Sequence, residues 1–179
     1  SNAPLNAETT VGGFSGNRAL KTSLTFTAKP WLKFRKYNGT KMPIENSSPE
    51  FTFTYNAGWK GVLESTADFQ QIELGVKSDF KIGVRASVDF NIQAGTFLNS
   101  NNVQFMDFKH FNGGLTEIAP LNVTGNYRLL DYYMYSTQKS YLSLISYVRF
   151  RKFLVTQIPL VRISGVKENL FVNYLKTDY

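Results

Sequence analysis

Apolar and polar residues alternate almost without interruption over residues 69–97, on both sides of one tight turn. Before the turn the apolar side chains are those of Ile72, Leu74, Val76, Phe80 and Ile82. After it they are those of Val84, Ala86, Val88, Phe90, Ile92 and Ala94. Because a strand places successive side chains on opposite faces, this pattern predicts two strands joined at Ile82-Gly83, each with one apolar and one polar face.

Each of these two arms is more than ten residues long, whereas strands of globular proteins average about 5–6 residues. Long strands with one apolar face, joined by a short turn, are typical of transmembrane β-barrels. In a soluble sandwich the same polar face would simply meet water, and the alternation alone does not separate the two. We therefore predict an all-β fold, an antiparallel meander of long strands that is part of an outer-membrane β-barrel.

Shorter segments complete a prediction of seven or eight strands. The other strands are expected at residues 19–28, 51–57, 103–110, 141–150 and 166–175, and residues 127–135 are expected to form a strand or an extended segment. Leu32 and Phe34 extend the first apolar face beyond a bend at Pro30. Loops or turns are expected at residues 36–49, 58–65, 99–102 and 115–126, with a bulge at Gly61. Residues 153–162 contain Pro159 and predict a short helix or a re-entrant loop.

The chain is long enough for one domain with a real core. Residues 1–3 are interpreted as the scar of an expression tag, residues 4–18 as a loop-like entry segment, and residues 19–179 as a single β-barrel or barrel-fragment domain. No apolar run approaches the length of a transmembrane helix. The mean hydropathy of −0.23 would suggest a soluble protein, but lumen-facing residues dilute the apolar ones in a barrel.

Composition excludes several classes of site. The chain has no Cys, so disulfides and thiolate metal sites are excluded. The net charge is +7, but Lys and Arg are spread along the predicted strands rather than gathered in one patch, so we expect no nucleic-acid partner. On the polar face, Glu73, Lys77, Asp79 and Lys81 are expected to meet Arg85 and Asp89 in a lattice of opposite charges.

His110 is the one histidine and hence the one candidate general base of a hydrolase. Asp107 lies three residues away, which on a strand places the two side chains on opposite faces. A catalytic His also needs a nucleophile and an orienting acid within hydrogen-bond reach. A structural role at the end of a strand is therefore the favoured interpretation.

An aromatic group at Tyr132, Tyr133 and Tyr135 could form a platform for sugars or bases. The favoured interpretation is a girdle at the membrane interface, where the ring is in apolar surroundings and the hydroxyl reaches the headgroup layer. Asp131 is expected to pair with Arg128 or a lumenal Lys.

Two further patterns carry no site. Residues 12–16 are rich in glycine but lack the Lys-Ser/Thr of a phosphate-binding loop. The acidic residues form no close ligand cluster. We predict no catalytic, cofactor-binding or metal-binding residue, and no cofactor.

Several segments together resemble a known family. The most specific are residues 105–113 (FMDFKHFNG) and 129–137 (LLDYYMYST), supported in order by residues 41–44, 55–61, 71–75, 94–98 and 157–162. Together they resemble the C-terminal barrel region of an uncharacterised outer-membrane family of Bacteroidota. Its members join an N-terminal carboxypeptidase-like regulatory domain to a barrel related to bacterial surface-antigen and outer-membrane assembly barrels.

The resemblance covers about three quarters of the chain. It implies the outer membrane of a Gram-negative bacterium, the lipid bilayer as partner, and no catalytic residues to transfer. With no regulatory domain and no closing strands, the chain is interpreted as a piece of a larger barrel. We expect a non-enzymatic component in transport, assembly or surface interaction. The alternative is a soluble barrel or sandwich that binds an apolar ligand, with a hydrolase third.

One apolar band is expected across neighbouring strands, comprising Leu20, Leu24, Phe26, Ile72, Leu74, Val76, Val84, Val88, Phe90 and Ile92. A piece of a barrel has two open edges and a bare band, which favours pairing with a second copy. Outside a membrane we expect the piece either to curl and bury the band or to share it with a second chain.

Overall fold

A computed structural model describes residues 18–44, 48–114, 124–128, 130–131, 133–151 and 153–178. The predicted tag scar at residues 1–3, nearly all of the entry segment at residues 4–18 and the glycine-rich residues 12–16 lie outside these ranges. So does most of the predicted loop at residues 115–126.

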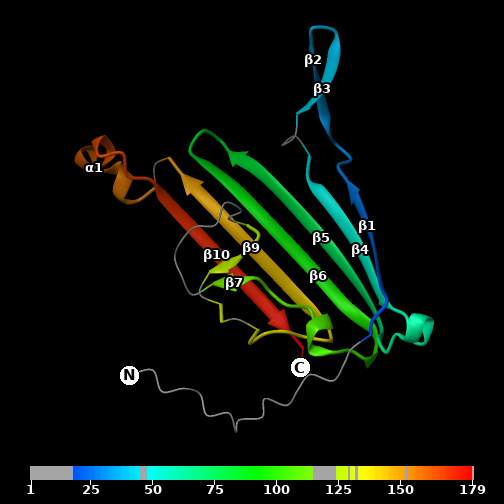
Figure 1. Ribbon diagram of the computed structural model, residues 1–179. Helices are drawn as coiled ribbons and strands as arrows, with labels where there is room; N and C mark the ends of the chain where they lie inside the picture. The colour runs from blue at the N-terminus through cyan, green and yellow to red at the C-terminus, as the bar shows by residue number, and fades with distance from the viewer. Residues whose placement is uncertain are drawn as a thin grey trace, which may run out of the picture.

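Six antiparallel strands form the main sheet, in the order β1-β4-β5-β6-β9-β10 (Figure 1). Their bounds are Lys21–Ala28 (β1), Glu50–Gly58 (β4), Asp68–Ile82 (β5), Ala86–Asn102 (β6), Tyr141–Phe150 (β9) and Glu168–Thr177 (β10). Every pair in the sheet is antiparallel. The predicted all-β antiparallel fold is therefore confirmed. Within the described ranges β1 and β10 each pair with one neighbour, and the sheet does not close between them.

The long hairpin predicted over residues 69–97 is confirmed. β5 and β6 pair antiparallel over almost their whole length, and Ile82 lies opposite Ala86. The turn therefore comprises residues 83–85, and Gly83 has a φ of +58°, a conformation that glycine adopts without steric cost.

The predicted turn at residues 99–102 is wrong, because β6 continues through it. The Asn99 amide donates to Asp68 at 2.9 Å across the sheet, so this turn-favouring residue is satisfied in a strand.

The loop predicted at residues 36–49 is also wrong over its first half. Residues Lys33–Tyr37 (β2) and Thr40–Ile44 (β3) form a separate antiparallel hairpin that projects from the sheet, and all their side chains are exposed (Figure 1). Asn38 and Gly39 connect them with φ values of 47° and 81°. Two successive positive φ values belong to the tight turn whose twist matches a hairpin. The Asn-Gly pair thus marks the turn of a hairpin and not a loop.

Of the two strands predicted between β6 and β9, one is absent from the described residues and the other is much shorter than expected. The strand expected at residues 103–110 is replaced by the 3₁₀ turn Phe105–Asp107 (η3) and an isolated bridge between Lys109 and Thr137. The strand expected at residues 127–135 is reduced to Tyr127–Arg128 (β8), which pairs parallel with Gly113–Gly114 (β7). Residues of this segment were expected to extend the sheet, and they lie over it instead.

The remaining connections contain short helical turns. The link expected at residues 58–65 holds the 3₁₀ turn Val62–Glu64 (η2), and Gly61 before it has a φ of +81°. Between β9 and β10 lie the 3₁₀ turn Val155–Gln157 (η4) and the helix Pro159–Ile163 (α1). The short-helix alternative for residues 153–162 is thus the correct one. No helix among the described residues is long and apolar enough to span a membrane.

The predicted apolar band is one face of the sheet, with two exceptions: Leu20 precedes β1, and Val84 lies in the turn. In register on this apolar face are Leu24, Phe26, Phe53, Ile72, Leu74, Val76, Val88, Phe90, Ile92, Leu142, Leu144 and Leu170. The chain does not curl to bury the band, since Phe26 and Leu74 are each 59% exposed. Of the two expected alternatives, burial by curling is not seen among the described residues, and sharing of the band with a second chain stays a prediction.

Candidate functional site

A cluster of buried hydrophobic residues, here called the buried core, lies on the polar face of the sheet and consists of Phe111, Tyr127, Tyr141 and Ile145. Three further buried hydrophobic residues, Ala57, Ala67 and Phe69, lie where β4 leads into β5. Tyr141 and Ile145 belong to the face of β9 that is in register with Gly95 and Asn91 of β6, opposite the apolar band. Phe111 and Tyr127 come from the described part of the segment between β6 and β9 (residues 103–114, 124–128, 130–131 and 133–140), here called the covering segment. The covering segment therefore shields polar residues of the sheet from solvent.

The exposed fractions of side chains in the sheet are the reverse of those in a simple amphipathic sheet, because some polar residues are buried and some apolar residues are exposed. Gln71 and Ser143, polar residues of β5 and β9, are 5% and 3% exposed. On the other face, Leu142 is 41% exposed although it is adjacent to Ser143 in sequence. Burial thus follows the covering segment and not the hydrophobicity of the face.

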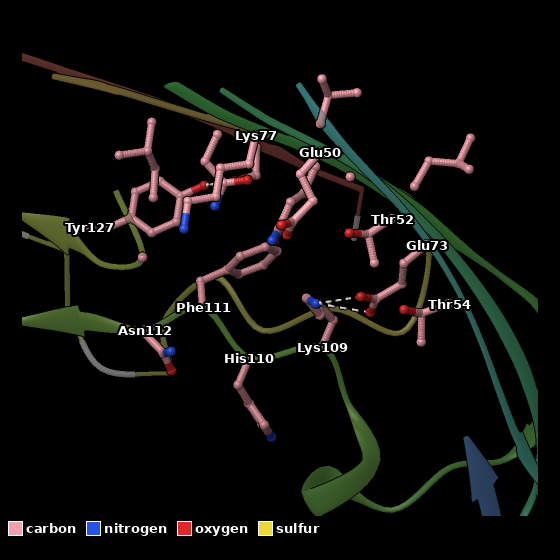
Figure 2. Close-up of a pocket in the computed structure, with 18 residues that line it drawn as sticks. Glu50, Thr52, Thr54, Glu73, Lys77, Lys109, His110, Phe111, Asn112 and Tyr127 are labelled. Atoms are coloured by element: carbon pink, nitrogen blue, oxygen red, sulfur yellow. Dashed lines mark hydrogen bonds and ion pairs between the residues drawn. The ribbon is translucent and has the colours of Figure 1, made fainter. Parts of the chain in front are cut away.

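A cavity of about 420 Å³ lies between the sheet and the covering segment (Figure 2). Its lining residues on the sheet include Glu50, Thr52, Thr54, Glu73, Lys77, Asn91, Gln93 and Ser143, and those on the covering segment include Lys109, Phe111, Asn112 and Tyr127. The cavity is thus lined mainly by amides, hydroxyls and charges of both signs, which suits water and polar solutes better than an apolar ligand.

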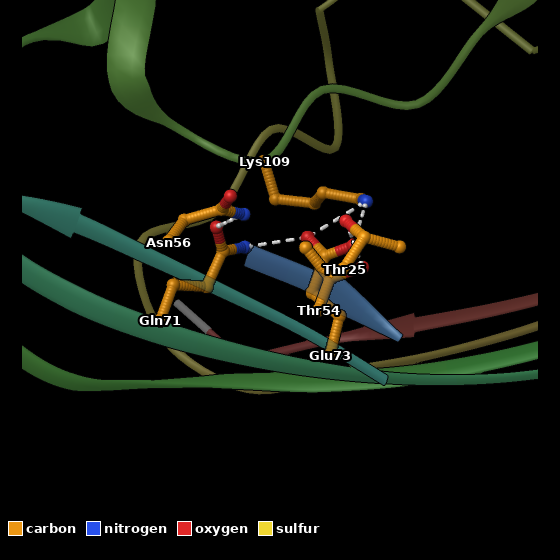
Figure 3. A network of polar contacts seen from close by, with 6 residues as sticks. All are labelled: Thr25, Thr54, Asn56, Gln71, Glu73 and Lys109. Atoms are coloured by element: carbon orange, nitrogen blue, oxygen red, sulfur yellow. Dashed lines mark hydrogen bonds and ion pairs between the residues drawn. The ribbon is translucent and has the colours of Figure 1, made fainter. Parts of the chain in front are cut away.

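One ion pair holds the covering segment to the sheet beside this cavity. Lys109 Nζ lies 2.9 Å from both carboxylate oxygens of Glu73 in β5 (Figure 3). The Gln71 amide donates to the same carboxylate at 2.8 Å, and the Asn56 amide donates to Gln71 at 3.2 Å. Glu73 therefore ends a chain of hydrogen bonds that begins in β4. Both charged side chains are only about one fifth exposed, so solvent screens the pair less than a surface pair.

Tyr127 makes a second connection to the sheet. Its hydroxyl donates to Ser143 Oγ in β9, and the ring packs edge-on against Phe111 at 6.1 Å between centroids. Burial raises the pKa of Tyr127 above its ordinary value, and the hydrogen bond to Ser143 lowers it in part. The phenol therefore remains protonated as a donor at neutral pH.

The structure separates the two residues weighed as an acid–base pair. Asp107 forms an ion pair with Lys21 of β1. His110 Nδ1 lies 2.7 Å from Ser136 Oγ, and His110 Nε2 lies 2.9 Å from the Phe105 carbonyl oxygen. Because a carbonyl only accepts, Nε2 donates to the Phe105 carbonyl oxygen, and Ser136 is the hydrogen-bond partner of Nδ1. His110 thus joins two parts of the covering segment, and a backbone carbonyl occupies the place of an orienting acid.

The expected tyrosine girdle is not on the apolar face. Tyr135 packs against the buried core of the polar face, and the prediction for it is wrong. Tyr133 is exposed, with its ring 5.1 Å from His110 and 5.8 Å from Phe105, while Tyr132 lies outside the described residues. Arg128 lies over the Phe171 ring at 4.5 Å instead of forming the expected pair with Asp131.

The expected lattice of opposite charges is only partly formed. Asp79 lies directly opposite Asp89 in the sheet, a like-charge pairing that destabilises by itself. Arg149 of β9 compensates it, with its guanidinium 2.9 Å from the Asp89 carboxylate. The compensating cations thus come from β9 and from the covering segment. Arg85 lies in the turn.

Two residues of the site, Lys109 and Gly95, are not predicted by the sequence. The pattern predicts Lys109 in a strand, and nothing in local spacing brings it to Glu73, 36 residues away. Gly95 did carry a signal, because a glycine inside an alternating strand often marks a close approach. Tyr141 lies across from it, and a Cβ on Gly95 would lie 2.5 Å from that ring.

No group of three or more His, Cys, Asp or Glu suited to a metal ion occurs among the described residues.

These features define a class of protein: an antiparallel β domain whose apolar face is bare and whose polar face is covered by its own chain. Compared with known families, residues 1–179 match the C-terminal domain of a family of unknown function (DUF5686). The chain belongs to that family. No curated protein and no solved structure matches it.

Proposed function

We propose that this domain is a non-enzymatic component of the outer membrane of a Gram-negative bacterium. In this proposal the six-stranded sheet forms part of the wall of a β-barrel, and the covering segment lies on the lumenal side. The resemblance of the chain further suggests a parent protein with a carboxypeptidase-like regulatory domain before the barrel.

The observation that carries the proposal is the position of the core. In water, a sheet buries its apolar face and leaves its polar face solvated. Here many large side chains of the apolar face are exposed, Phe26 and Leu74 among them, and others such as Phe90 are partly exposed. Buried polar residues lie beneath the covering segment. A lipid-facing wall with a filled interior has this distribution, because hydrocarbon covers the apolar face.

Strand length supports the same proposal. A transmembrane strand needs about 9–11 residues when tilted. β4, β9 and β10 have 9, 10 and 10 residues, and β5 and β6 have 15 and 17. The two longest strands would extend beyond the hydrocarbon and carry their turn into the aqueous phase.

A barrel in hydrocarbon must leave no strand edge unpaired. The outer edges of β1 and β10 would therefore pair with further strands of the parent protein. A lumen crossed by the covering segment, with its polar cavity, suits a role in transport, assembly or surface interaction, and the lipid bilayer is the partner that the apolar face requires.

A partition experiment tests the proposal on the full-length parent. We expect the protein to require detergent for extraction and to migrate faster in gels when it is not boiled, because a closed barrel resists detergent unfolding. A parent that is soluble without detergent and binds fatty acids would instead identify a soluble module whose apolar face holds an apolar ligand.

The other candidate function is that of a hydrolase, because the contact between His110 and Ser136 pairs a possible base with a possible nucleophile. Ser136 is absent from the residues lining the polar cavity, and the His110 ring is held by a carbonyl instead of a carboxylate. An ester-hydrolysing activity lost in both His110→Ala and Ser136→Ala would establish an enzyme and contradict the non-enzymatic role.

A further inference from the structure

The β5–β6 turn and α1 lie at the same end of the main sheet (Figure 1). Positively charged side chains line a cavity at this end. We propose that this cavity binds the phosphate headgroup of an anionic lipid. The inference rests on the proposed membrane location and adds to it a site and a ligand class.

The cavity measures about 570 Å³, within the range of ligand sites in proteins. Four cations line it: Lys81 from β5, Arg149 from β9, Arg151 just after β9, and Lys167 just before β10. No acidic residue is among the described residues that line it. The expectation that Lys and Arg are not clustered is therefore wrong at this end, because the register of β5, β6, β9 and β10 brings together cations distant in sequence.

Little of this charge is neutralised by the protein. Arg149 pairs with Asp89 at 2.9 Å, while Lys81, Arg151 and Lys167 form no ion pair with an acidic residue of the described ranges. Glu168 is adjacent to Lys167 in sequence, but its carboxylate accepts hydrogen bonds from the backbone N–H groups of residues 153–155 at 2.6–3.1 Å. An anionic ligand would supply the missing counter-charge.

The backbone helps to position the arginines. The Arg151 N–H donates to the Arg85 carbonyl oxygen at 2.8 Å, which joins the end of β9 to the β5–β6 turn. The Arg151 guanidinium, which has no acidic partner among the described residues, suits phosphate because the planar group donates two parallel hydrogen bonds to its oxygens. Basic pockets at the membrane surface bind lipid headgroups in this way.

The apolar residues of the cavity favour a lipid over free phosphate. Ala86 and Phe150 belong to the apolar face of the sheet, whereas Lys81, Arg149 and Asn169 belong to the polar face. The cavity therefore lies where the two faces meet. Val84 at its rim is 80% exposed, which suits contact with the acyl region beside the headgroup.

The test uses the full chain and vesicle flotation. One set of vesicles contains phosphatidylcholine alone, and the other contains about one third phosphatidylglycerol. The variant is the double substitution Arg151→Gln with Lys167→Gln. The matched control is Lys60→Gln with Lys176→Gln, which removes the same charge at the opposite end of the sheet, where both residues are exposed.

We expect the wild type and the control to bind the anionic vesicles more tightly than the neutral ones. Each cation near an anionic surface contributes about fivefold in affinity, so the double variant should lose roughly 25-fold on anionic vesicles and nothing on neutral ones. Raised salt should reduce the difference.

The proposed site would be contradicted if the variant and the control lost the same affinity for anionic vesicles, or if the variant lost none. It would also be contradicted if calorimetry showed that glycerol 3-phosphate binds as tightly as lipid does. Absence of binding to every vesicle would instead count against the membrane location itself, so the two failures are distinguishable.

Discussion

Gly95 lies at a position where the fold leaves no room for a larger residue. An added Cβ would lie 2.5–2.8 Å from three atoms of the Tyr141 side chain, which belongs to the buried core. We expect Gly95→Ala to lower the free energy of unfolding by about 1–3 kcal/mol, the usual cost of overpacking, as measured by denaturant unfolding.

Gly75→Ala is the matched control, since this glycine lies on the same polar face of the sheet and its added Cβ would meet nothing closer than 3.6 Å. It should be nearly neutral or slightly stabilising. Equal destabilisation by both substitutions would contradict the packing of Tyr141 on Gly95.

The ion pair between Lys109 and Glu73 should stabilise the covering segment on the sheet, beside the contacts of Asp107 with Lys21 and of Tyr127 with Ser143. Lys109→Met leaves a partly buried carboxylate without its cation, and we expect a loss of about 1–3 kcal/mol. Amide hydrogen exchange should rise in residues 103–114 and stay unchanged in β5 and β6.

Lys60→Met removes an exposed cation elsewhere and should leave the exchange unchanged. The double variant Lys109→Met with Glu73→Gln should be less destabilised than the two single losses added together. Strict additivity would show that the pair does not contribute.

At the scale of elements, β6 presents its two faces to different surroundings. Val88 lies on the apolar face, opposite Phe80 and Val148, whereas Ser87 lies on the polar face. In the parent barrel, an Arg on the lipid side costs about 2–4 kcal/mol at midplane and far less on the lumenal side.

Val88→Arg should therefore impair membrane assembly much more than Ser87→Arg, as followed by the fraction of heat-modifiable protein. Equal tolerance of the two changes would mean that the faces are assigned the wrong way round.

The whole molecule combines a bare apolar face with two outer strands, β1 and β10, that each pair on one side only within the described residues. Without a bilayer, both features favour association with a second copy. We expect the isolated chain to sediment as a dimer or larger species, and detergent micelles to convert it to monomers. A monomer at high concentration in plain buffer would contradict this expectation.

The sequence by itself determined the strands and their faces. The alternation over residues 69–97 is a direct consequence of backbone geometry, so it predicted β5, β6 and the partition of Leu74 from Glu73 without knowledge of any neighbour. Similar local patterns predicted β1, β4, β9 and β10. Errors arose where turn-favouring residues were satisfied across the sheet, as at Asn99, or formed a hairpin, as at Asn38.

Only the tertiary structure decided which face is covered. The contact of Lys109 with Glu73 and that of Tyr127 with Ser143 join residues far apart in sequence, and no local period encodes such pairs. The gathering of Arg151, Lys167 and Lys81 likewise follows from strand register. The alternation of residues along a strand predicts that its two faces differ in polarity. What lies against each face depends on contacts between residues that are far apart in the sequence.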